Sequence, residues 1–514
     1  MGSKKLSRSE STIINLITSV IAWGWPMLLA LVVTPLLVHG LGEDAYGMRG
    51  LIFTIMGYFA LMDLGLNTAG TKYLAEYIAI NDSDSVRELL GTTLLVYLIG
   101  GLIGCGVIWL TSSWLILSIF KIPLALQQES IWSFRIAGLG FFLSMLTWWG
   151  TSIPSGLQRF DVSNWISVGF GTVTSLSSLA AVLLGQGLIG VIWASVFANF
   201  LTVIAYWISI KRLLPGVTIH PSFSWKMFKR TTLFGLWGIL FRVVGVSVTQ
   251  LDRILIAMWL GPAAVTYFLV SRRVASPVHQ INAKMLQVVF PMASEFSATA
   301  SSEKLQHLFL RSMNLSIVVA IGMALPIFVL AQPFMTYWMS EEFALHTAEL
   351  VRILTLCFCL TAQTAAPSAI LPGMGYPQVP FIAAVLSSMV LLPGYFLLIR
   401  PLGIVGAGWA YMASCILVLA FYAIVSVRKI KVSPARLMQS VLKPLISALV
   451  IGYIVDVFAV PLVKNLFTVL LVGAGMGGVY GVAVWFGGVF DDNEKRTLKT
   501  FILKRMSLPL KGGR

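Results

Sequence analysis

Charged residues are scarce in this chain, and acidic residues are the scarcer of the two kinds. Only 11% of its 514 residues are charged, with 36 Lys and Arg against 20 Asp and Glu, whereas soluble domains carry about 25% charged residues. Hydrophobic residues make up 57% of the chain, and the mean hydropathy is +0.87. This composition excludes a water-soluble protein and indicates an all-α polytopic membrane protein.

Cysteines are also few, and their positions exclude two kinds of site. Cys105, Cys357, Cys359 and Cys415 all lie in apolar stretches, so they cannot form a surface disulfide framework. Cys357 and Cys359 are too close together, and too deep in a predicted helix, to hold a metal. We expect four core residues and no metal site.

Two further absences exclude classes of function. The sequence has no Gly-x-x-x-x-Gly-Lys-Ser/Thr nucleotide loop, so the energy for any transport is expected from an ion gradient of H⁺ or Na⁺, from the membrane potential or from downstream consumption of the product. The predicted outer loops are very short, as at 185–187 and 400–403, and leave no extracellular domain for an enzyme site. We therefore expect a protein that is not an enzyme, needs no cofactor and binds no nucleic acid.

Long apolar stretches fill the chain, and those of about 20 residues or more predict membrane-spanning helices. About 14 are predicted, at 12–38, 46–72, 88–118, 128–153, 161–184, 187–211, 229–259, 262–297, 307–338, 345–371, 377–399, 402–427, 436–459 and 465–490. Lys and Arg concentrate in one alternate set of loops, around 211–230 and 428–443. By the positive-inside rule, that set and both termini are cytoplasmic.

The chain repeats one plan in two halves. Segments 187–194 and 403–410 share the pattern Gly-x-x-Gly-x-x-Trp-Ala, and Arg135 and Arg352 are separated by almost the same length of chain as these two segments. The repeat predicts two pseudo-symmetric six-helix lobes, 1–214 and 215–430, related by an axis along the membrane normal. Residues 431–514 then add helices 13 and 14 and a basic cytoplasmic tail.

Basic side chains within the predicted helices are the candidates for a binding site. An Arg or Lys at the bilayer centre costs about 2.5–3.5 kcal/mol even on the gentlest scale, so several on common helix faces indicate a water-filled cationic cavity. Surplus positive charge there suits a phosphate-bearing substrate, which arginine binds bidentately. The predicted substrate-binding residues are Arg135, Arg242, Arg253, Arg273, Gln280, Lys284, Arg352 and Gln363.

Two acids inside predicted helices, Asp63 and Asp252, are the candidates for ion coupling. Structural alternatives exist for several of the charged residues. Asp252 and Arg253 would also form an interfacial pair, and Asp63 would also lock its helix. Arg135 and Arg352 would also stabilise the two halves alike, and Arg272 beside Arg273 would extend to the outer headgroups.

Short motifs across residues 10–430 occur in the order and spacing of a known family. They are 35–46, 63–66 leading to 72–73, 156–161, 251–254 with 260–262, 289–291 and 373–377. In these segments the chain resembles polysaccharide-biosynthesis flippases of the Wzx type, in the multidrug/oligosaccharidyl-lipid/polysaccharide (MOP) exporter superfamily. One departure is Lys72, where the family usually has Arg, so a bidentate substrate contact is not expected there.

The resemblance implies a V-shaped bundle of two six-helix lobes that works by alternating access. The implied function is a flippase that moves an undecaprenyl-diphosphate-linked oligosaccharide from the cytoplasmic to the outer leaflet of a bacterial cytoplasmic (inner) membrane, for cell-surface polysaccharide synthesis. The implied partners are this anionic lipid-linked oligosaccharide, membrane lipids, a polysaccharide polymerase and a chain-length regulator. The family's cationic cavity would correspond to the basic residues named above by their position in the bundle.

Three other functions share parts of this pattern. A flippase for the peptidoglycan lipid precursor would use the same diphosphate chemistry. A multidrug-type, ion-coupled exporter of small molecules would have the same architecture, although surplus Arg disfavours cationic drugs. A membrane glycosyltransferase or polymerase would usually need catalytic acids in sizeable outer loops, which this sequence lacks.

Overall fold

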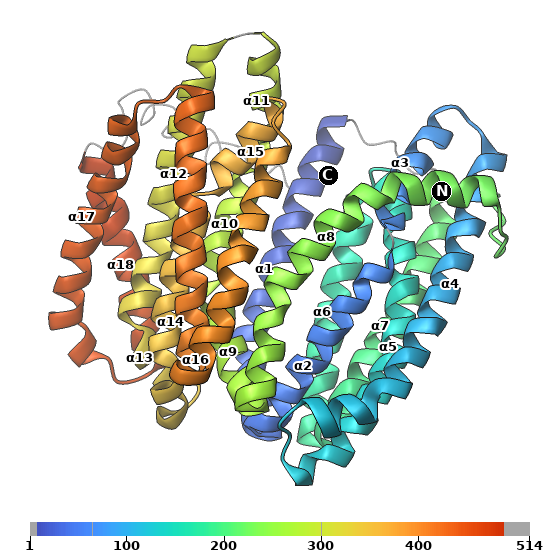
Figure 1. The fold of residues 1–514 in the computed structure, drawn as a ribbon, viewed down its shortest axis with the longest axis horizontal. Helices are drawn as coiled ribbons and strands as arrows, with labels where there is room; N and C mark the ends of the chain where they lie inside the picture. Colours follow the sequence, from blue (N-terminus) through green and yellow to red (C-terminus); the bar gives the residue numbers. More distant parts are fainter. Residues whose placement is uncertain (1–7, 64, 300, 488–514) are drawn as a thin grey trace, which may run out of the picture. The chain divides into compact units, whose positions relative to one another are not determined.

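A computed structural model describes the backbone of residues 8–63, 65–299 and 301–487. Side chains are described for the same residues except 8–23, 234, 236–249, 288, 436–437 and 439–441. The described part of the chain is helical and contains no strand, which confirms the all-α prediction. It forms two compact units, divided between Thr266 and Tyr267, and each unit is described by itself (Figure 1).

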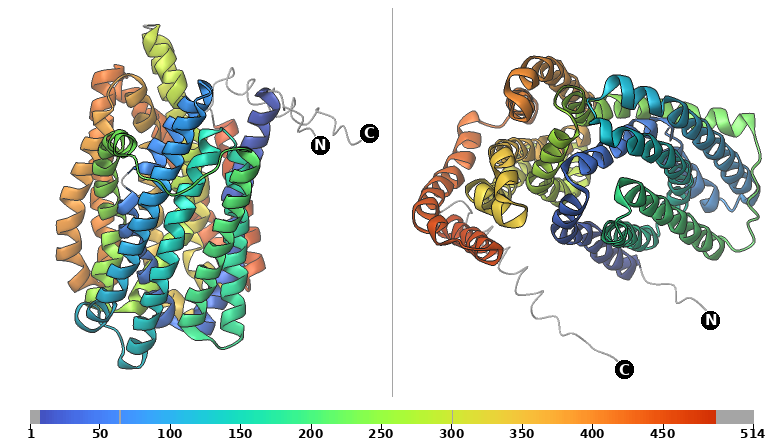
Figure 2. Two further views of the ribbon diagram at one scale, coloured as in Figure 1. Left: turned by 90° about the vertical axis from the view of Figure 1, so that its right-hand side faces the viewer. Right: turned by 90° about the horizontal axis from the view of Figure 1, so that it is seen from below.

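Unit 1 is built from long helices joined by short turns. Its helices are α1 (Arg8–Leu41), α2 (Glu43–Phe59), η1 (Ala60–Asp63), α3 (Leu66–Ala79), α4 (Ser83–Trp114), η2 (Leu115–Ile119), α5 (Leu124–Gly156), α6 (Phe160–Leu183), α7 (Gly187–Leu213) and α8 (Trp225–Leu260). The long helices pack in the spatial order α4, α5, α7, α6, α1. Helix α2 contacts α1, α5, α7 and α8, so it lies between the others (Figure 2).

Unit 2 is centred on α14, which packs against α12, α13 and α16. After α9 (Pro262–Ala275), which crosses the boundary, the helices are α10 (Pro277–Met285), η3 (Leu286–Val288), α11 (Val289–Ala298), α12 (Ser302–Val329), α13 (Ala331–Trp338), α14 (Glu341–Ala362), α15 (Ala365–Gly373), α16 (Gln378–Ile430), α17 (Pro434–Phe458), η4 (Val460–Leu462) and α18 (Leu466–Phe486). The predicted additional helices, α17 and α18, pack on α12 at the margin of unit 2 (Figure 2).

Every predicted span coincides with a helix or a run of consecutive helices. Within the described residues, 11 helices are long and apolar enough to cross a membrane. The 53-residue α16 counts once among them, although non-helical backbone at Gly403 divides it into the two predicted spans. The run α9–α11 is not among them, because it is broken into short helices and carries Arg272, Arg273 and Lys284.

Two of the predicted spans are broken rather than continuous. In the first half, α2 gives way to η1 and then to α3, with Gly65 at φ 70° before α3 begins. In the second half, α9 ends before Pro277, and η3 separates α10 from α11. Pro291 has no N–H to donate to the carbonyl four residues earlier, which accounts for the change of helix type at 286–288.

The glycines of the repeated Gly-x-x-Gly-x-x-Trp-Ala pattern have the same roles in both halves. Gly187 and Gly403 both adopt left-handed backbone, with φ of 59° and 61°, which glycine tolerates without strain. Three residues later, a Cβ on Gly190 would overlap the Gln186 side chain, and one on Gly406 would overlap the carbonyl oxygen of Leu398. The pattern therefore specifies one tight helical turn, used twice.

A second pair of contacts confirms the pseudo-symmetry. A Cβ on Gly156 would lie 3.0 Å from the carbonyl oxygen of Thr71, and one on Gly373 would lie 3.0 Å from that of Phe290. Gly156 and Gly373 occupy equivalent positions in the repeat, and so do Thr71 and Phe290. The close approach of α3 to the end of α5 is thus repeated between α11 and α15.

Helix α8 contacts the first half of the chain along its length. It packs against α2 and α3, and the backbones come close at Gly65, where a Cβ would lie 2.6 Å from the Cα of Gly235. Unit 1 therefore includes α8, although the repeat assigns residues 215–260 to the second half. The lobe boundaries at 214 and 430 stay predictions from the repeat.

Side-chain caps explain where several helices begin. The Asp82 carboxylate accepts the N–H of Ser85 at 3.0 Å at the start of α4, and the bonds from Ser85 hold the pKa of Asp82 below its usual value. Asn465 and Thr468 form a capping box at the start of α18. Glu129 of α5 accepts the N–H of Leu188 at 2.7 Å, which ties α5 to the first turn of α7.

The turn at Gly406 gives a test of the fold. Gly406→Ala is expected to lower the apparent Tm of the detergent-purified protein by several degrees, because the new methyl group has to displace the Leu398 carbonyl. The matched control is Gly106→Ala, since no atom lies within 4 Å of a Cβ there; Ala is the better helix former by about 0.5–1 kcal/mol. A Gly406→Ala protein as stable as the Gly106→Ala protein would contradict this packing.

Candidate functional site

Arg135 lies at the seam between α4 and α5 in unit 1. Its guanidinium donates to the hydroxyls of Ser112 and Ser113, both at 3.4 Å. The same group lies 5.3 Å from the ring centre of Trp109 and 5.0 Å from that of Trp132, within cation–π range. Within the described part of the chain, Arg135 has hydroxyl and aromatic partners and no carboxylate.

Arg352, the repeat equivalent of Arg135, has a similar environment in unit 2. It is half-buried on α14, and its Nε donates to the carbonyl oxygen of Phe328 near the end of α12 at 3.4 Å. No described carboxylate pairs with it. Both arginines therefore keep their positive charge inside helices of their units, where they also tie two helices together.

Arg253 and Asp252 lie on α8, against α2. The Asp252 side chain is fully buried, and its carboxylate lies 4.0 Å from Nε of Arg253. The Arg253 side chain is 21% exposed, and its Nη1 donates to Thr54 Oγ1 at 3.4 Å. The sequence offered an Asp252–Arg253 pair as the structural alternative to a binding role. The two residues do lie beside each other, at the contact between α2 and α8.

The basic side chains of α9 and α10 have different surroundings. Arg272 lies 5.7 Å from the ring centre of Phe358 and 6.0 Å from that of Tyr411. These rings belong to α14 and α16, so the expectation that Arg272 extends to the outer headgroups is wrong. Arg272 instead lies against two aromatic rings of its own unit, unit 2.

Three predicted site residues on α9 and α10 have exposed side chains: Arg273, Gln280 and Lys284. The Gln280 amide donates to Ser276 Oγ at 3.0 Å. Lys284 makes no polar contact with another described residue of the chain. Its ammonium group is therefore available to a ligand.

Asp63 occupies the break between η1 and α3. Its side chain is 2% exposed, and it accepts hydrogen bonds from the Tyr97 hydroxyl and from the N–H of Asn67. Asn67 in turn donates to the Trp148 carbonyl oxygen at 2.6 Å and to Thr151 at 2.9 Å. This buried carboxylate is thus part of a polar network that joins α3, α4 and α5.

The equivalent positions in the second half carry amides. By the spacing of the repeat, Asn282 corresponds to Asp63, and Asn314 corresponds to Tyr97. Asn282 is fully buried and donates to the carbonyl oxygen of Val278 at 2.9 Å; the side-chain oxygens of both asparagines are buried without a hydrogen-bond partner. Only the first half therefore has a titratable group at this place in the repeat.

Gln363, at the end of α14, is a predicted site residue that the structure buries to 6% exposure. Its amide nitrogen donates to the carbonyl oxygen of Cys359 at 3.2 Å, and its amide oxygen is buried without a partner. Of the four cysteines predicted as core residues, Cys357 and Cys415 are buried, whereas Cys105 and Cys359 are half-buried. Among the described residues, no group of His, Cys, Asp and Glu is arranged to hold a metal.

Sequence analysis missed a cluster between the C-terminal end of α3 and the N-terminal end of α8. Arg230 donates to the Tyr77 hydroxyl at 3.0 Å and to Glu76 at 3.1 Å, and its guanidinium lies 4.6 Å from the ring centre of Tyr73. Lys72 lies 3.7 Å from Glu76. Arg230, which sequence analysis had counted only as a loop charge, thus joins the start of α8 to α3.

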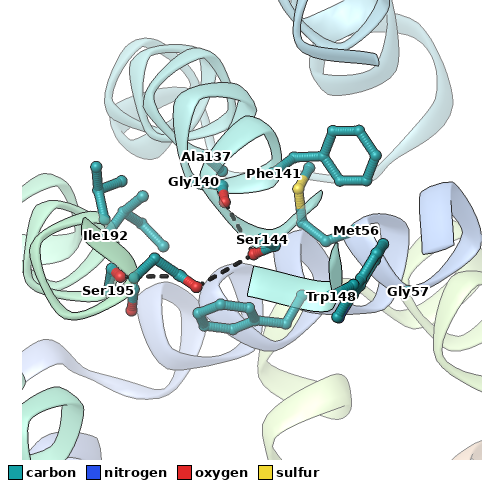
Figure 3. Close-up of a pocket in the computed structure, with 12 residues that line it drawn as sticks. Met56, Gly57, Ala137, Gly140, Phe141, Ser144, Trp148, Ile192 and Ser195 are labelled. Atoms are coloured by element: carbon teal, nitrogen blue, oxygen red, sulfur yellow. Dashed lines mark hydrogen bonds between the residues drawn. The ribbon is translucent and has the colours of Figure 1, made fainter. Parts of the chain in front are cut away.

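Unit 1 also contains a cavity of about 150 Å³ between α2, α5 and α7 (Figure 3). Aromatic and small polar side chains line much of it: Phe53, Phe141, Trp148, Ser144, Ser195 and Asn199. Ser144 Oγ lies 3.3 Å from Asn199 Oδ1, and Asn199 donates to the carbonyl oxygen of Ser195 at 3.1 Å. No charge marked these residues in the sequence, so their convergence could not be predicted.

The predicted residues fall into two groups. Arg135, Arg253, Asp63 and Asp252 lie in unit 1, whereas Arg273, Gln280, Lys284, Arg352 and Gln363 lie in unit 2. The side chain of Arg242 lies outside the described residues. A continuous cationic track through all of them stays a prediction.

The sequence profile of one protein family, described as polysaccharide biosynthesis protein, matches residues 37–347. A curated relative from Shigella flexneri, named "Putative O-antigen transporter", is 21% identical over 418 residues. That alignment covers 79% of this chain and 96% of the relative.

Solved structures share the fold. A structure of the lipid II flippase MurJ in an inward closed conformation matches with a TM-score of 0.72 at 15% identity, over 95% of this chain and 100% of that one. An inward-facing multidrug resistance MATE family transporter of the MOP superfamily matches with a TM-score of 0.69 at 15% identity, over 80% and 98%. These likenesses confirm the predicted architecture.

The Asp252–Arg253 pair makes a specific prediction about stability. Arg253→Ala leaves the buried Asp252 carboxylate without its neighbouring cation and is expected to destabilise the protein by about 3 kcal/mol. The double variant Asp252→Asn/Arg253→Gln removes both charges and should recover most of that loss. Apparent Tm values of the purified variants test this, and equal losses in the single and double variants would contradict the pairing.

Proposed function

Because the chain belongs to the polysaccharide biosynthesis protein family, we propose that it is a flippase for an undecaprenyl-diphosphate-linked oligosaccharide. It moves this lipid from the cytoplasmic to the outer leaflet for cell-surface polysaccharide synthesis, by alternating access through a cationic central cavity. The protein is not an enzyme on this proposal. It is a multi-pass protein of the inner membrane with both termini in the cytoplasm.

The observation that carries the proposal is the pair Arg135 and Arg352. They occupy equivalent places in the two halves, and neither has a carboxylate partner among the described residues. An arginine within a membrane helix is costly unless something compensates it. A substrate diphosphate supplies that compensation, and the planar guanidinium matches phosphate oxygens bidentately.

Lys284 supports the same chemistry. Its side chain is exposed on α10 and has no polar partner among the described residues, so it is not needed to neutralise a structural acid. A cation with this freedom suits a transient anionic ligand. It disfavours the alternative of a multidrug-type exporter of cationic drugs, whose substrate it would repel.

A flippase for the peptidoglycan lipid precursor would share the lipid diphosphate, and the fold matches a lipid II flippase. The family profile and the relative named as an O-antigen transporter favour the polysaccharide substrate instead. A polysaccharide polymerase and a chain-length regulator are the partners expected to receive the translocated unit.

Asp63 is the proposed site of coupling to a proton gradient. It is a buried carboxylate at the end of η1, next to the start of α3, and it accepts hydrogen bonds from the Tyr97 hydroxyl and from the N–H of Asn67. Asp252, the other acid considered for coupling, lies 4.0 Å from Nε of Arg253. The amide Asn282, at the equivalent place in the second half, cannot titrate.

The role of Lys284 is tested by export in cells that depend on this protein. Lys284→Ala is expected to reduce surface polysaccharide at least tenfold while the amount of protein in the membrane stays normal. Lys284→Arg should retain most of the export, since it keeps the charge, and Lys304→Ala is the control for a basic residue at the start of α12. Normal export by Lys284→Ala would remove Lys284 from the binding site.

The coupling proposal predicts how transport responds to ion gradients. In vesicles, collapse of the proton gradient should stop translocation by the wild-type protein, and removal of Na⁺ should not. Asp63→Asn preserves the size of the side chain and an acceptor for Tyr97, so the protein should fold but translocate at least tenfold more slowly. Unchanged, proton-dependent transport by Asp63→Asn would contradict this assignment.

A further inference from the structure

We propose that the cavity between α2, α5 and α7 in unit 1 is a subsite for one neutral sugar ring of the transported lipid-linked glycan. The inference rests on the proposed function and deepens it, because it names the part of the substrate that this cavity recognises. Four features of the cavity carry it: its size, its aromatic walls, its uncharged polar groups and its place beside Arg253.

The cavity has the volume of a single ring. It measures about 150 Å³, and an engineered cavity of about that volume in another protein accommodates one benzene molecule. Among its lining residues, Phe53 is 41% exposed and Ile192 is 1% exposed. A ring can therefore enter from the surface of unit 1 and be largely enclosed.

The aromatic lining fits the apolar face of a sugar. Phe53, Phe141 and Trp148 all border the cavity. The rings of Phe141 and Trp148 are edge to face, with their centres 6.2 Å apart. A pyranose presents C–H groups on its faces and hydroxyl groups around its edge. Aromatic rings supply a large, rigid apolar surface for the face of such a ring.

The polar lining fits the hydroxyl edge of the same ring. Ser144, Ser195 and Asn199 come from α5 and α7, and Figure 3 shows Ser144 and Ser195 approaching the cavity from these two helices. Asn199 uses one N–H for the Ser195 carbonyl oxygen, so its amide has a second N–H to donate. The serine oxygens also keep acceptor capacity.

The absence of charge in the lining selects the kind of group that binds. No residue of the described lining is charged, so a phosphate or a cation would enter without a counter-charge, which is costly. A lipid acyl chain would be accepted by the aromatic rings but would make no use of the second N–H of Asn199 or of the serine acceptors. A neutral, hydroxylated ring satisfies both kinds of wall.

Helix α2 connects the cavity to a cation, because one of its residues binds Arg253. Phe53 and Gly57 line the cavity, while Thr54, between them on the same helix, accepts from Arg253. A Cβ on Gly57 would overlap the Gln250 side chain, so α8 lies directly behind this wall. A diphosphate bound at Arg253 would place the attached sugar near the cavity.

The test compares two lipids in binding to the purified protein in nanodiscs. The probes are undecaprenyl diphosphate and undecaprenyl diphosphate that carries one N-acetylhexosamine. The wild-type protein should bind the sugar-bearing lipid about tenfold more tightly, the gain of about 1.4 kcal/mol that one or two good hydrogen bonds supply. Asn199→Leu and the milder Ser144→Ala should each remove most of this gain without changing the affinity for the bare lipid. Ser209→Ala, farther along α7, should change neither affinity.

The outcomes separate the subsite from the proposed function. Equal affinity for the two lipids in the wild-type protein would overturn the subsite and leave the flippase proposal standing. A full sugar-dependent gain in folded Asn199→Leu and Ser144→Ala would do the same, as would tighter binding of the bare lipid by Asn199→Leu, which indicates an acyl-chain pocket. If neither lipid bound the wild-type protein, the proposed function itself would fail.

Discussion

A lipid bilayer offers no water to a polar group, so each charge within a membrane helix must be satisfied by the protein or by something the protein binds. This constraint accounts for the arrangement of the charged residues here. Asp252 lies beside Arg253, and Asp63 is held by the Tyr97 hydroxyl and a backbone N–H. Arg135 and Arg352 have hydroxyl, aromatic or carbonyl partners among the described residues and so retain a net charge that suits an anionic substrate.

The duplication supplies one scaffold to two halves that differ in chemistry. Gly187 and Gly403 make the same left-handed turn, and Gly156 and Gly373 permit the same close helix contact. On this shared scaffold the first half has a carboxylate where the second has Asn282. The first half also has a cavity with aromatic and uncharged polar walls. The two lobes of a flippase can in this way share a shape while they bind different parts of a substrate or a coupling ion.

The sequence predicted the fold well because apolar length and small residues determine it locally. The predicted spans coincide with helices, and the first glycine of the repeated pattern has the same backbone conformation in both halves, as one plan used twice requires. The site was harder to predict, because a side chain's direction depends on its neighbours in other helices. Within unit 2, Arg272 lies against Phe358 and Tyr411, and neither ring is near it in sequence. The cavity around Asn199 has no charge to mark it, and only packing brings its three helices together.

The most direct test of the central claim is the sidedness of the lipid-linked oligosaccharide when this protein is depleted. Inside-out and right-side-out membrane vesicles would be treated with a membrane-impermeant reagent that oxidises sugars. The account predicts that the lipid-linked unit accumulates and is labelled only at the cytoplasmic face. Labelling at the outer face as strong as in undepleted membranes would show that the lipid crosses by another route and would contradict the account.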